Sequence, residues 1–377
     1  MSRLPDFRLE TYFSRWEFAA SHHLTASDAQ TLTLVELLEL ADDDDLAAFQ
    51  TMSFGYTETF GDPGLRQAIS ETYTAASADD VICFAGAEEA LFLAMQVLLE
   101  SDDHAIVITP NYQAAETVPL SICQVTGVAL DPADDWRLDL DRVVAAIRPN
   151  TKVISVNFPN NPTGKVLPVD EFVRLAGICD DRGIHLFSDE VYRGLETDPT
   201  RTLPQAADLS PLALSLNVTS KALGLPGLRI GWITCRDREI RSRLERAKHY
   251  TTICNSAPSE ILARIAIKAR ARILGRNQAI IAENLPLFDS FFQEFEELFR
   301  WQPPDGGCVA YPQYLGADGV EDFCRRLVEQ AGVLLLPASI YRSELTDTPA
   351  DRFRIGVGRN NPEPGLEAFA GWLRARS

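Results

Sequence analysis

The feature that most constrains the fold of this chain is a regular alternation of short apolar runs with longer amphipathic stretches, which begins near residue 60. The apolar runs predict strands over residues 81–84, 105–109, 124–130, 152–157, 184–188, 212–216 and 230–234. The stretches between them predict helices over residues 62–76, 87–99, 113–120, 139–147 and 168–182. This order is typical of an α/β domain with a mostly parallel sheet flanked by helices. Ligands of such sheets bind at the carboxyl ends of the strands.

The 377-residue chain is long enough for more than one domain, and we expect three parts. Residues 1–45 are expected to form an N-terminal arm and part of a small domain, with a short helix over 34–40 that Asp28 caps. Residues 46–276 are expected to form the large domain, which ends in a charged helical segment. Residues 277–377 are expected to form a small α+β domain. Its predicted elements are helices over 277–299, 319–331 and 363–375, and strands over 333–336 and 352–356.

The net charge excludes two classes of partner. It is −19, because 54 acidic residues outnumber 35 basic ones. Such a field repels the phosphates of nucleic acids and the headgroups of anionic lipids. We therefore expect neither nucleic-acid binding nor binding to a membrane surface. No apolar run reaches some 18 residues, so no membrane span is expected either.

The cysteines and histidines show no metal-site pattern. The seven cysteines are scattered without a C-x-x-C pair, which is typical of reduced residues in a cytoplasmic protein. The five histidines do not gather at metal-ligand spacing, so no metal is predicted. The first residues lack the apolar core of a signal peptide, which also favours a cytoplasmic location.

One lysine, Lys221, follows the predicted strand 212–216 in a turn rich in hydroxyl groups and glycine, and Arg229 lies eight positions later. Burial among small and apolar residues, together with a nearby cation, lowers the pKa of an amine. An amine of that kind can form a Schiff base with a carbonyl. Taken alone, such a lysine is more often an exposed surface residue, so the assignment depends on further motifs.

Two motifs follow predicted strands at the same edge of the sheet. Asp189 ends the run 184–188 and begins Asp-Glu-Val-Tyr192, so its carboxylate is expected at the carboxyl edge of the sheet. Asn161 lies in Asn-Pro-Thr-Gly164, which follows the strand 152–157. The tetrapeptide alone is also a common turn sequence. Its place 28 residues before Asp189 makes it a stronger indication of a site.

A third motif is the strand-to-helix turn of Gly86, Ala87 and Glu88. The first N–H groups of a helix have no partner within the helix, and the helix dipole adds positive potential there. Such a turn binds phosphate.

Together these motifs resemble those of the class I/II aminotransferases, which are pyridoxal-phosphate (PLP) enzymes of fold type I. The resemblance runs from about residue 50 to the end of the chain, with its motifs in the family's order. It implies a large domain with a mostly parallel sheet, a smaller α+β domain and PLP as the cofactor. It implies that Lys221 binds PLP covalently, that Asp189 pairs with the ring nitrogen, and that Tyr192 and Asn161 bind the phenolic oxygen.

The resemblance also implies roles for residues outside these motifs. Tyr112 is expected to stack on the cofactor, and Arg354, in Phe-Arg-Ile-Gly356, to bind the substrate α-carboxylate beside Asn161. Tyr56 is expected to reach the phosphate of a neighbouring subunit, which implies a homodimer with shared active sites. The remaining phosphate ligands are expected to be the turn described above, with Thr219, Ser220 and Arg229.

The chain departs from the family pattern at several positions. Ala85 and Ala87 stand where relatives often have a hydroxyl residue, and Val218 stands where a phosphate-binding serine is common. The arm around Ser27 and Asp28 also differs from the usual substrate-proximal stretch, and Asp28 could pair with a basic group of the substrate instead of capping the helix. Backbone amides and an arginine still supply most of the attraction for a phosphate. The unusual arm indicates a narrow, pathway-specific substrate.

The function indicated is an aminotransferase that acts on an amino acid or an amino-acid conjugate in a specialised biosynthetic pathway. The same scaffold also supports β-elimination as in C–S lyases, cyclisation, and decarboxylating or oxidative deamination. A non-catalytic PLP sensor fused to a DNA-binding module is disfavoured, because no such module fits before residue 50 and the chain is acidic.

Overall fold

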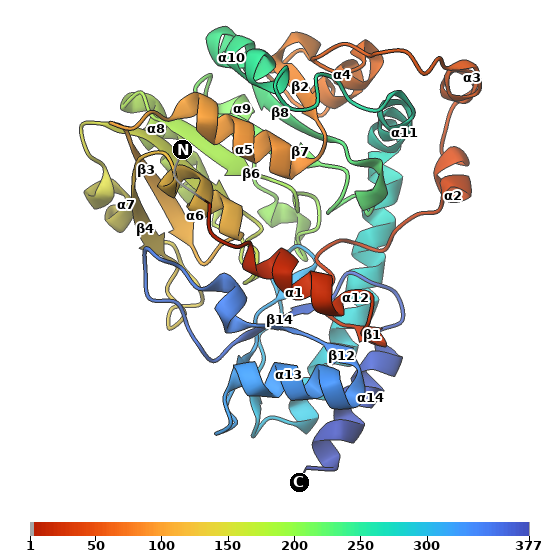
Figure 1. Cartoon of the computed structure of the whole chain (residues 1–377), viewed down its shortest axis with the longest axis vertical. Coiled ribbons are helices and arrows are strands. Elements are labelled where there is room, and N and C mark those ends of the chain that lie inside the picture. Colours follow the sequence, from red (N-terminus) through yellow and green to blue (C-terminus); the bar gives the residue numbers. More distant parts are fainter. Residues whose placement is uncertain (1–3, 377) are drawn as a thin grey trace.

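The computed structural model describes residues 4–376, and a seven-stranded sheet forms its centre (Figure 1). The strand order is β2-β8-β7-β6-β5-β3-β4. The strands are β2 (Val81–Phe84), β3 (His104–Thr109), β4 (Gln124–Ala129), β5 (Thr151–Asn157), β6 (His185–Asp189), β7 (Leu214–Val218) and β8 (Gly231–Cys235). The five strands from β7 to β4 are parallel, whereas β8 is antiparallel to both β2 and β7. The predicted mostly parallel sheet is confirmed.

The reversed direction of β8 follows from the connection before it. A parallel crossover needs a dozen or more residues, usually a helix. Residues 219–230, between β7 and β8, contain no α-helix that could carry the chain back along a face of the sheet, only the 3₁₀ turn Pro226–Leu228, and the chain returns beside β7 in the opposite direction. This short return is the loop that carries Lys221.

Helices cover both faces of the sheet, and the strands are apolar on both sides for that reason. Ala105 of β3 packs on one face with α5 (Ala87–Leu98), α6 (Gln113–Leu120) and α10 (Arg238–Lys248). The next residue, Ile106, packs on the other face with α7 (Leu140–Ala146) and α8 (Val169–Asp181). Shorter helices and α11 complete this domain: α3 (Asp43–Thr51), α4 (Pro63–Ser70), α9 (Ala206–Leu209) and α11 (Ala257–Lys268).

The C-terminal part packs around an aromatic cluster and lies at the bottom of Figure 1. Its helices are α12 (Arg270–Glu294), α13 (Val320–Ala331) and α14 (Glu363–Arg374). Its strands are β9 (Phe299–Arg300), β10 (Val309–Ala310), β11 (Gln313–Tyr314), β12 (Val333–Leu334), β13 (Leu336–Pro337) and β14 (Phe353–Gly356). Phe299 and Phe323 lie at the centre of the cluster, each within 6 Å of Phe353.

The N-terminal segment connects the two parts. It contains α1 (Arg8–Trp16), β1 (His22–His23) and α2 (Leu34–Leu38). Strand β1 pairs in parallel with β12 of the C-terminal part. Arg8 donates hydrogen bonds to the carbonyl oxygens of Ile340 and Arg342, which fixes α1 across the molecule (Figure 1).

Several predicted boundaries were wrong. The helix expected over 62–76 ends at Ser70, and the helix expected from 277 begins at Arg270, so the proposed domain boundary at 276 falls inside α12. Helices α1 and α3 were not predicted. Asp28 does not cap α2, because Thr33 is its N-cap and forms a capping box with Glu36.

Candidate active site

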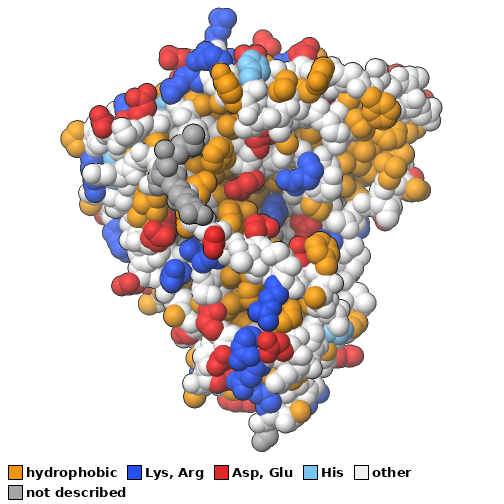
Figure 2. Space-filling model, viewed as in Figure 1, with side chains coloured by type: hydrophobic (Ala, Val, Ile, Leu, Met, Phe, Trp, Pro, Cys, Tyr) orange, Lys and Arg blue, Asp and Glu red, His pale blue; other side chains and the backbone are white. Residues whose placement is uncertain are grey.

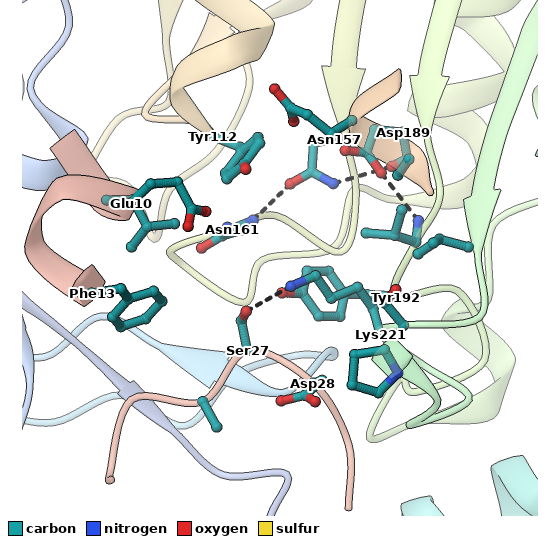
Figure 3. A pocket seen from close by; sticks show the side chains of 18 of the residues that line it. Glu10, Phe13, Ser27, Asp28, Tyr112, Asn157, Asn161, Asp189, Tyr192 and Lys221 are labelled. Atoms are coloured by element: carbon teal, nitrogen blue, oxygen red, sulfur yellow. Dashed lines mark hydrogen bonds between the residues drawn. The ribbon is translucent and has the colours of Figure 1, made fainter. Parts of the chain in front are cut away.

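A cavity of about 560 Å³ opens where β5, β6 and β7 end, between the sheet, the N-terminal arm and the C-terminal part (Figures 2 and 3). Figure 2 shows acidic and basic side chains around this hollow in the middle of the face. The predicted site residues that line it are Ala87, Glu88, Tyr112, Asn161, Asp189, Tyr192, Ser220, Lys221, Arg229 and Arg354. The topology therefore brings together motifs that span more than 260 positions of the sequence.

Lys221 lies inside the cavity, where its Nζ donates a 2.8 Å hydrogen bond to the Ser27 hydroxyl (Figure 3). Burial lowers the pKa of this amine below its ordinary value. Asp28 opposes the shift, and the positive charge of Arg354 adds to it. The predicted neighbouring cation was Arg229, so this detail was wrong. The side chain of Arg229 instead lies beside Gly86.

Asp189 ends β6 and presents its carboxylate to the cavity. Its backbone oxygen accepts a 3.1 Å hydrogen bond from Asn157 Nδ2, and its Oδ1 accepts a 3.2 Å bond from the Val191 amide (Figure 3). Burial raises the pKa of Asp189 to about 6, while Lys221 acts in the opposite direction. A buried carboxylate with so few donors fits a cationic partner such as a protonated pyridine nitrogen.

Two hydroxyl groups in the cavity are buried without a hydrogen bond of ordinary geometry. They belong to Tyr192, which is 1% exposed, and Ser220, which is 7% exposed. Ser27 lies near enough to lower the pKa of Tyr192 slightly, against the larger rise that burial causes. An unpaired buried hydroxyl costs about 1–3 kcal/mol. Both groups therefore fit polar atoms of a ligand, such as a phenolic oxygen and a phosphate.

The start of α5 has the features of an anion site. Gly86 is its N-cap with φ of +98° and no capping side chain. A Cβ at Gly86 would lie 2.5 Å from Arg229 Nη2, so only glycine lets the guanidinium approach the helix end this closely. Ser220, Ala87 and Arg229 line the same cavity. Free N–H groups, a hydroxyl and a guanidinium fit a phosphate dianion.

Thr219 is not part of this cluster. Its hydroxyl is fully buried, and the carbonyl oxygens of Leu225 and Ile230 lie 3.3 and 3.1 Å away as its partners. It therefore stabilises the loop that holds Lys221 and does not line the cavity.

Arg354 is fully buried on β14 and held by neutral acceptors. Its Nη1 donates to the Tyr341 hydroxyl at 2.7 Å and its Nη2 donates to the Thr25 carbonyl at 2.7 Å. Asn161 Oδ1 accepts hydrogen bonds from Tyr341 at 3.1 Å and from Arg354 at 3.4 Å. Among the described residues no carboxylate forms an ion pair with Arg354. An uncompensated buried guanidinium fits a carboxylate ligand.

Tyr112 and Glu88 form one wall. The ring of Tyr112 packs against Phe7, with centroids 5.2 Å apart. Burial raises the pKa of Glu88 to about 7, and a hydrogen bond with Tyr112 lowers it in part. Tyr56 is outside the cavity and 92% exposed, so the structure does not bring it to the site of its own chain.

The sequence placed the arm around Ser27 and Asp28 near the substrate, but it did not predict the wall that the helix α1 forms. Glu10 and Phe13 of α1 and Glu17 at its C-cap line the cavity. Asp28 also lines it and forms a 2.7 Å ion pair with Arg359. The spacing of Glu10, Phe13 and Glu17 on one helical face is the signal that was available. Within the described residues no group of three or more His, Cys, Asp or Glu could hold a metal ion. No helix of the described chain has the length and apolarity to cross a membrane.

The chain is similar to known proteins over nearly its whole length. The family model described as aminotransferase class I and II matches residues 23–368. Capreomycidine synthase of Streptomyces vinaceus is 27% identical over 97% of this chain and 93% of that protein. A probable kynurenine–oxoglutarate transaminase of Saccharomyces cerevisiae is 28% identical over 67% of this chain and 61% of that protein.

Solved structures agree with these matches. A PLP-dependent aminotransferase from Streptococcus suis superposes with a TM-score of 0.92 at 28% identity, covering 100% of this chain and 99% of that one. The PLP-dependent cyclase OrfR superposes with a TM-score of 0.90 at 26% identity, covering 100% of this chain and 98% of that one.

Proposed function

The chain belongs to the class I and II aminotransferases, which are PLP-dependent enzymes of fold type I, and on this premise we propose that it transfers the amino group of an α-amino acid in a biosynthetic pathway. One observation carries the proposal: a single cavity holds both Lys221, whose pKa is lowered, and the buried guanidinium of Arg354, which no carboxylate of residues 4–376 neutralises.

The residues of the cavity fit PLP. Ser220, Arg229 and the start of α5 would hold the phosphate, and Asp189 would keep a proton on the ring nitrogen as its counter-ion. Tyr192 and Asn161 would bind the phenolic oxygen. When bound, PLP supplies a carbonyl that links to amines and a ring that withdraws electrons from the substrate Cα.

Lys221 would move the proton at the substrate Cα. A lowered pKa leaves a larger share of the amine neutral near pH 7, and only the neutral amine accepts a proton. Arg354 would hold the substrate carboxylate with a two-point guanidinium contact beside Asn161, which fixes the Cα relative to the lysine.

The test is a reaction of purified enzyme with a panel of amino acids, with and without 2-oxoglutarate, oxaloacetate or pyruvate. We expect repeated turnover only when a keto acid is present, together with a change in the visible spectrum of the cofactor. The panel should extend to uncommon amino acids, because the unusual arm favours a narrow substrate. Turnover that needs no keto acid would refute transamination.

A second candidate reaction is supported by two relatives. The names of capreomycidine synthase and the cyclase OrfR show that close structural relatives include enzymes other than aminotransferases. Cyclisation, β-elimination and decarboxylating or oxidative deamination all begin at the same Cα. Products formed without an acceptor, such as ammonia and pyruvate from a cysteine conjugate, would identify this class.

A further inference from the structure

The proposed function, on which this inference rests, gives most charged side chains of the cavity a partner in the cofactor or the substrate. Arg229 faces the phosphate end, Arg354 faces the substrate carboxylate, and Asp189 faces the ring nitrogen. Asp28 and Arg359 neutralise each other at 2.7 Å. Lys221 is the reacting amine.

Three carboxylates remain after this assignment. Glu88 shares a hydrogen bond with Tyr112, and the other two are Glu10 of α1 and Glu17 at the C-cap of that helix. Neither forms a hydrogen bond or an ion pair with another described residue. The basic residues of the same helix are engaged elsewhere: Arg8 binds backbone carbonyls and Arg15 lies 4.0 Å from Glu329. Figure 3 shows Glu10 directed into the cavity, toward Tyr112 and Asn161.

Within the described residues, no basic side chain forms an ion pair with Glu10 or Glu17, and Lys221 is the positive charge that acts on Glu17. Burial raises the pKa of Glu17, the negative charges of Glu10 and Asp28 raise it further, and the positive charge of Lys221 lowers it in part. The charge of Glu10 also contributes to the raised pKa of Glu88. Carboxylates that form no ion pair within the protein favour a cationic group of a ligand beside them.

Phe13 lies between the two glutamates in the sequence and on the same helical face. Its ring also lines the cavity. A phenyl ring offers apolar surface to an alkyl chain and its π-face to a cation. The cavity is independently marked as a ligand site by the buried, unpaired hydroxyls of Tyr192 and Ser220.

We propose that the substrate is an amino acid whose side chain ends in a positively charged group, an ammonium or a guanidinium, which binds at Glu10 and Glu17 with its alkyl stem against Phe13. The carboxylate of the same substrate binds Arg354, which lines the same cavity. The two ends of the substrate thus meet opposite charges, which fixes its orientation as well as its affinity.

The experiment compares charged amino acids with neutral ones of nearly the same shape, by titrating the PLP-loaded enzyme and following the visible spectrum. The pairs are L-arginine with L-citrulline and L-lysine with L-norleucine. We expect the charged member of at least one pair to bind about tenfold more tightly, since each partly exposed ion pair contributes up to about 1 kcal/mol. The preference should weaken as salt is added.

The variant Glu10→Gln/Glu17→Gln should reduce the preference to about twofold or less. The matched control, Glu283→Gln, removes an exposed carboxylate of α12 that does not line the cavity, and should keep the full preference. Because the two members of a pair are compared within one protein, a general loss of stability does not change the ratio.

The outcomes separate the two proposals. Equal affinity for charged and neutral members, or a preference that survives in the double variant, would overturn the cationic substrate while leaving PLP chemistry intact. If no amino acid of any kind changes the spectrum of the PLP-loaded enzyme, the proposed function itself fails.

Discussion

At the scale of single residues, the chemistry depends on which groups in the cavity carry protons. Lys221→Ala removes the amine that would link to PLP, so we expect a protein without the yellow colour of the linked cofactor and without turnover. Borohydride reduction of the wild-type enzyme, followed by peptide mapping, should place PLP on Lys221. Finding the label on another lysine would overturn the assignment.

Asp189→Asn should keep PLP bound but reduce turnover by about a thousandfold, because an amide cannot hold the ring nitrogen protonated. The measurement is kcat for the substrate that the amino-acid panel identifies, with PLP at saturation. Asp181→Asn is a suitable control, because it changes an exposed aspartate at the end of α8 in the same way. A rate within a few-fold of wild type for Asp189→Asn would assign the nitrogen to another partner.

Asp189→Asn should also stabilise the protein without bound PLP. The pKa of Asp189 is raised to about 6 in the fold. The folded state therefore binds this proton more strongly than the unfolded state, and charging the group at neutral pH costs stability. The cost is fully present above pH 6 and disappears as the pH falls toward the unfolded pKa near 4. Asp189→Asn should thus raise the free energy of unfolding of PLP-free protein at pH 8 by up to about 3 kcal/mol.

Urea unfolding at pH 8 and at pH 4.5 checks this expectation. The gain in the free energy of unfolding should be smaller at pH 4.5, where wild-type Asp189 is already protonated in the folded state. An equal gain at both pH values would show that charge is not the cause.

The sequence indicated most of these residues because each follows a strand whose carboxyl end faces the cavity. It failed where position depends on distant packing. The cation that lowers the pKa of Lys221 is Arg354, 133 positions away, and not the nearby Arg229. Asp28 pairs with Arg359 because β1 adds to the C-terminal part, a contact that no local pattern encodes.

At the scale of elements, the strand-to-helix turn before α5 can be tested through its glycine. Gly86→Ala places a Cβ 2.5 Å from Arg229 at a φ of +98°, so the guanidinium must move away from the helix end. We expect PLP to bind at least tenfold more weakly, while pyridoxal, which lacks the phosphate, loses less affinity. Gly183→Ala is the control, because Gly183 also has positive φ (+64°) but nothing within 4 Å of its Cβ.

Both variants should lose about 1 kcal/mol of stability through backbone strain, but only Gly86→Ala should lose PLP affinity. Equal PLP affinity in the two variants would remove the phosphate site from this turn.

The prediction of elements succeeded where long apolar runs alternate with amphipathic helices, and failed for α1. This helix has nine residues, too few to be stable alone. It forms because Arg8 binds the carbonyls of Ile340 and Arg342 and because Phe7 packs against Tyr112. Such contacts join residues more than 100 positions apart, so the segment was interpreted only as an arm.

At the scale of the whole molecule, the arm, the sheet and the C-terminal part each contribute a wall to one cavity, and a second copy of the chain is expected to contribute more. Exposed aromatic and aliphatic residues support this expectation: Phe54 is 85%, Tyr56 92% and Tyr250 92% exposed. A contact between Thr57 and Asn255 places their two segments side by side. Figure 2 shows hydrophobic side chains gathered at the upper right, where α2, α3 and α11 lie in Figure 1.

We therefore expect a homodimer with twice the chain mass of 41.7 kDa, in which Tyr56 completes the phosphate site of the neighbouring subunit. Because burial of apolar side chains drives association, Phe54→Asp/Tyr250→Asp should yield monomers at micromolar concentration. The same variant should bind PLP more weakly, since each monomer lacks its neighbour's Tyr56.

Val173→Asp, at an exposed apolar residue of α8, should leave the dimer intact. Light scattering gives the mass, and PLP titration gives the affinity. Wild-type monomers, or unchanged PLP affinity in both Tyr56→Phe and the monomeric variant, would refute the shared site.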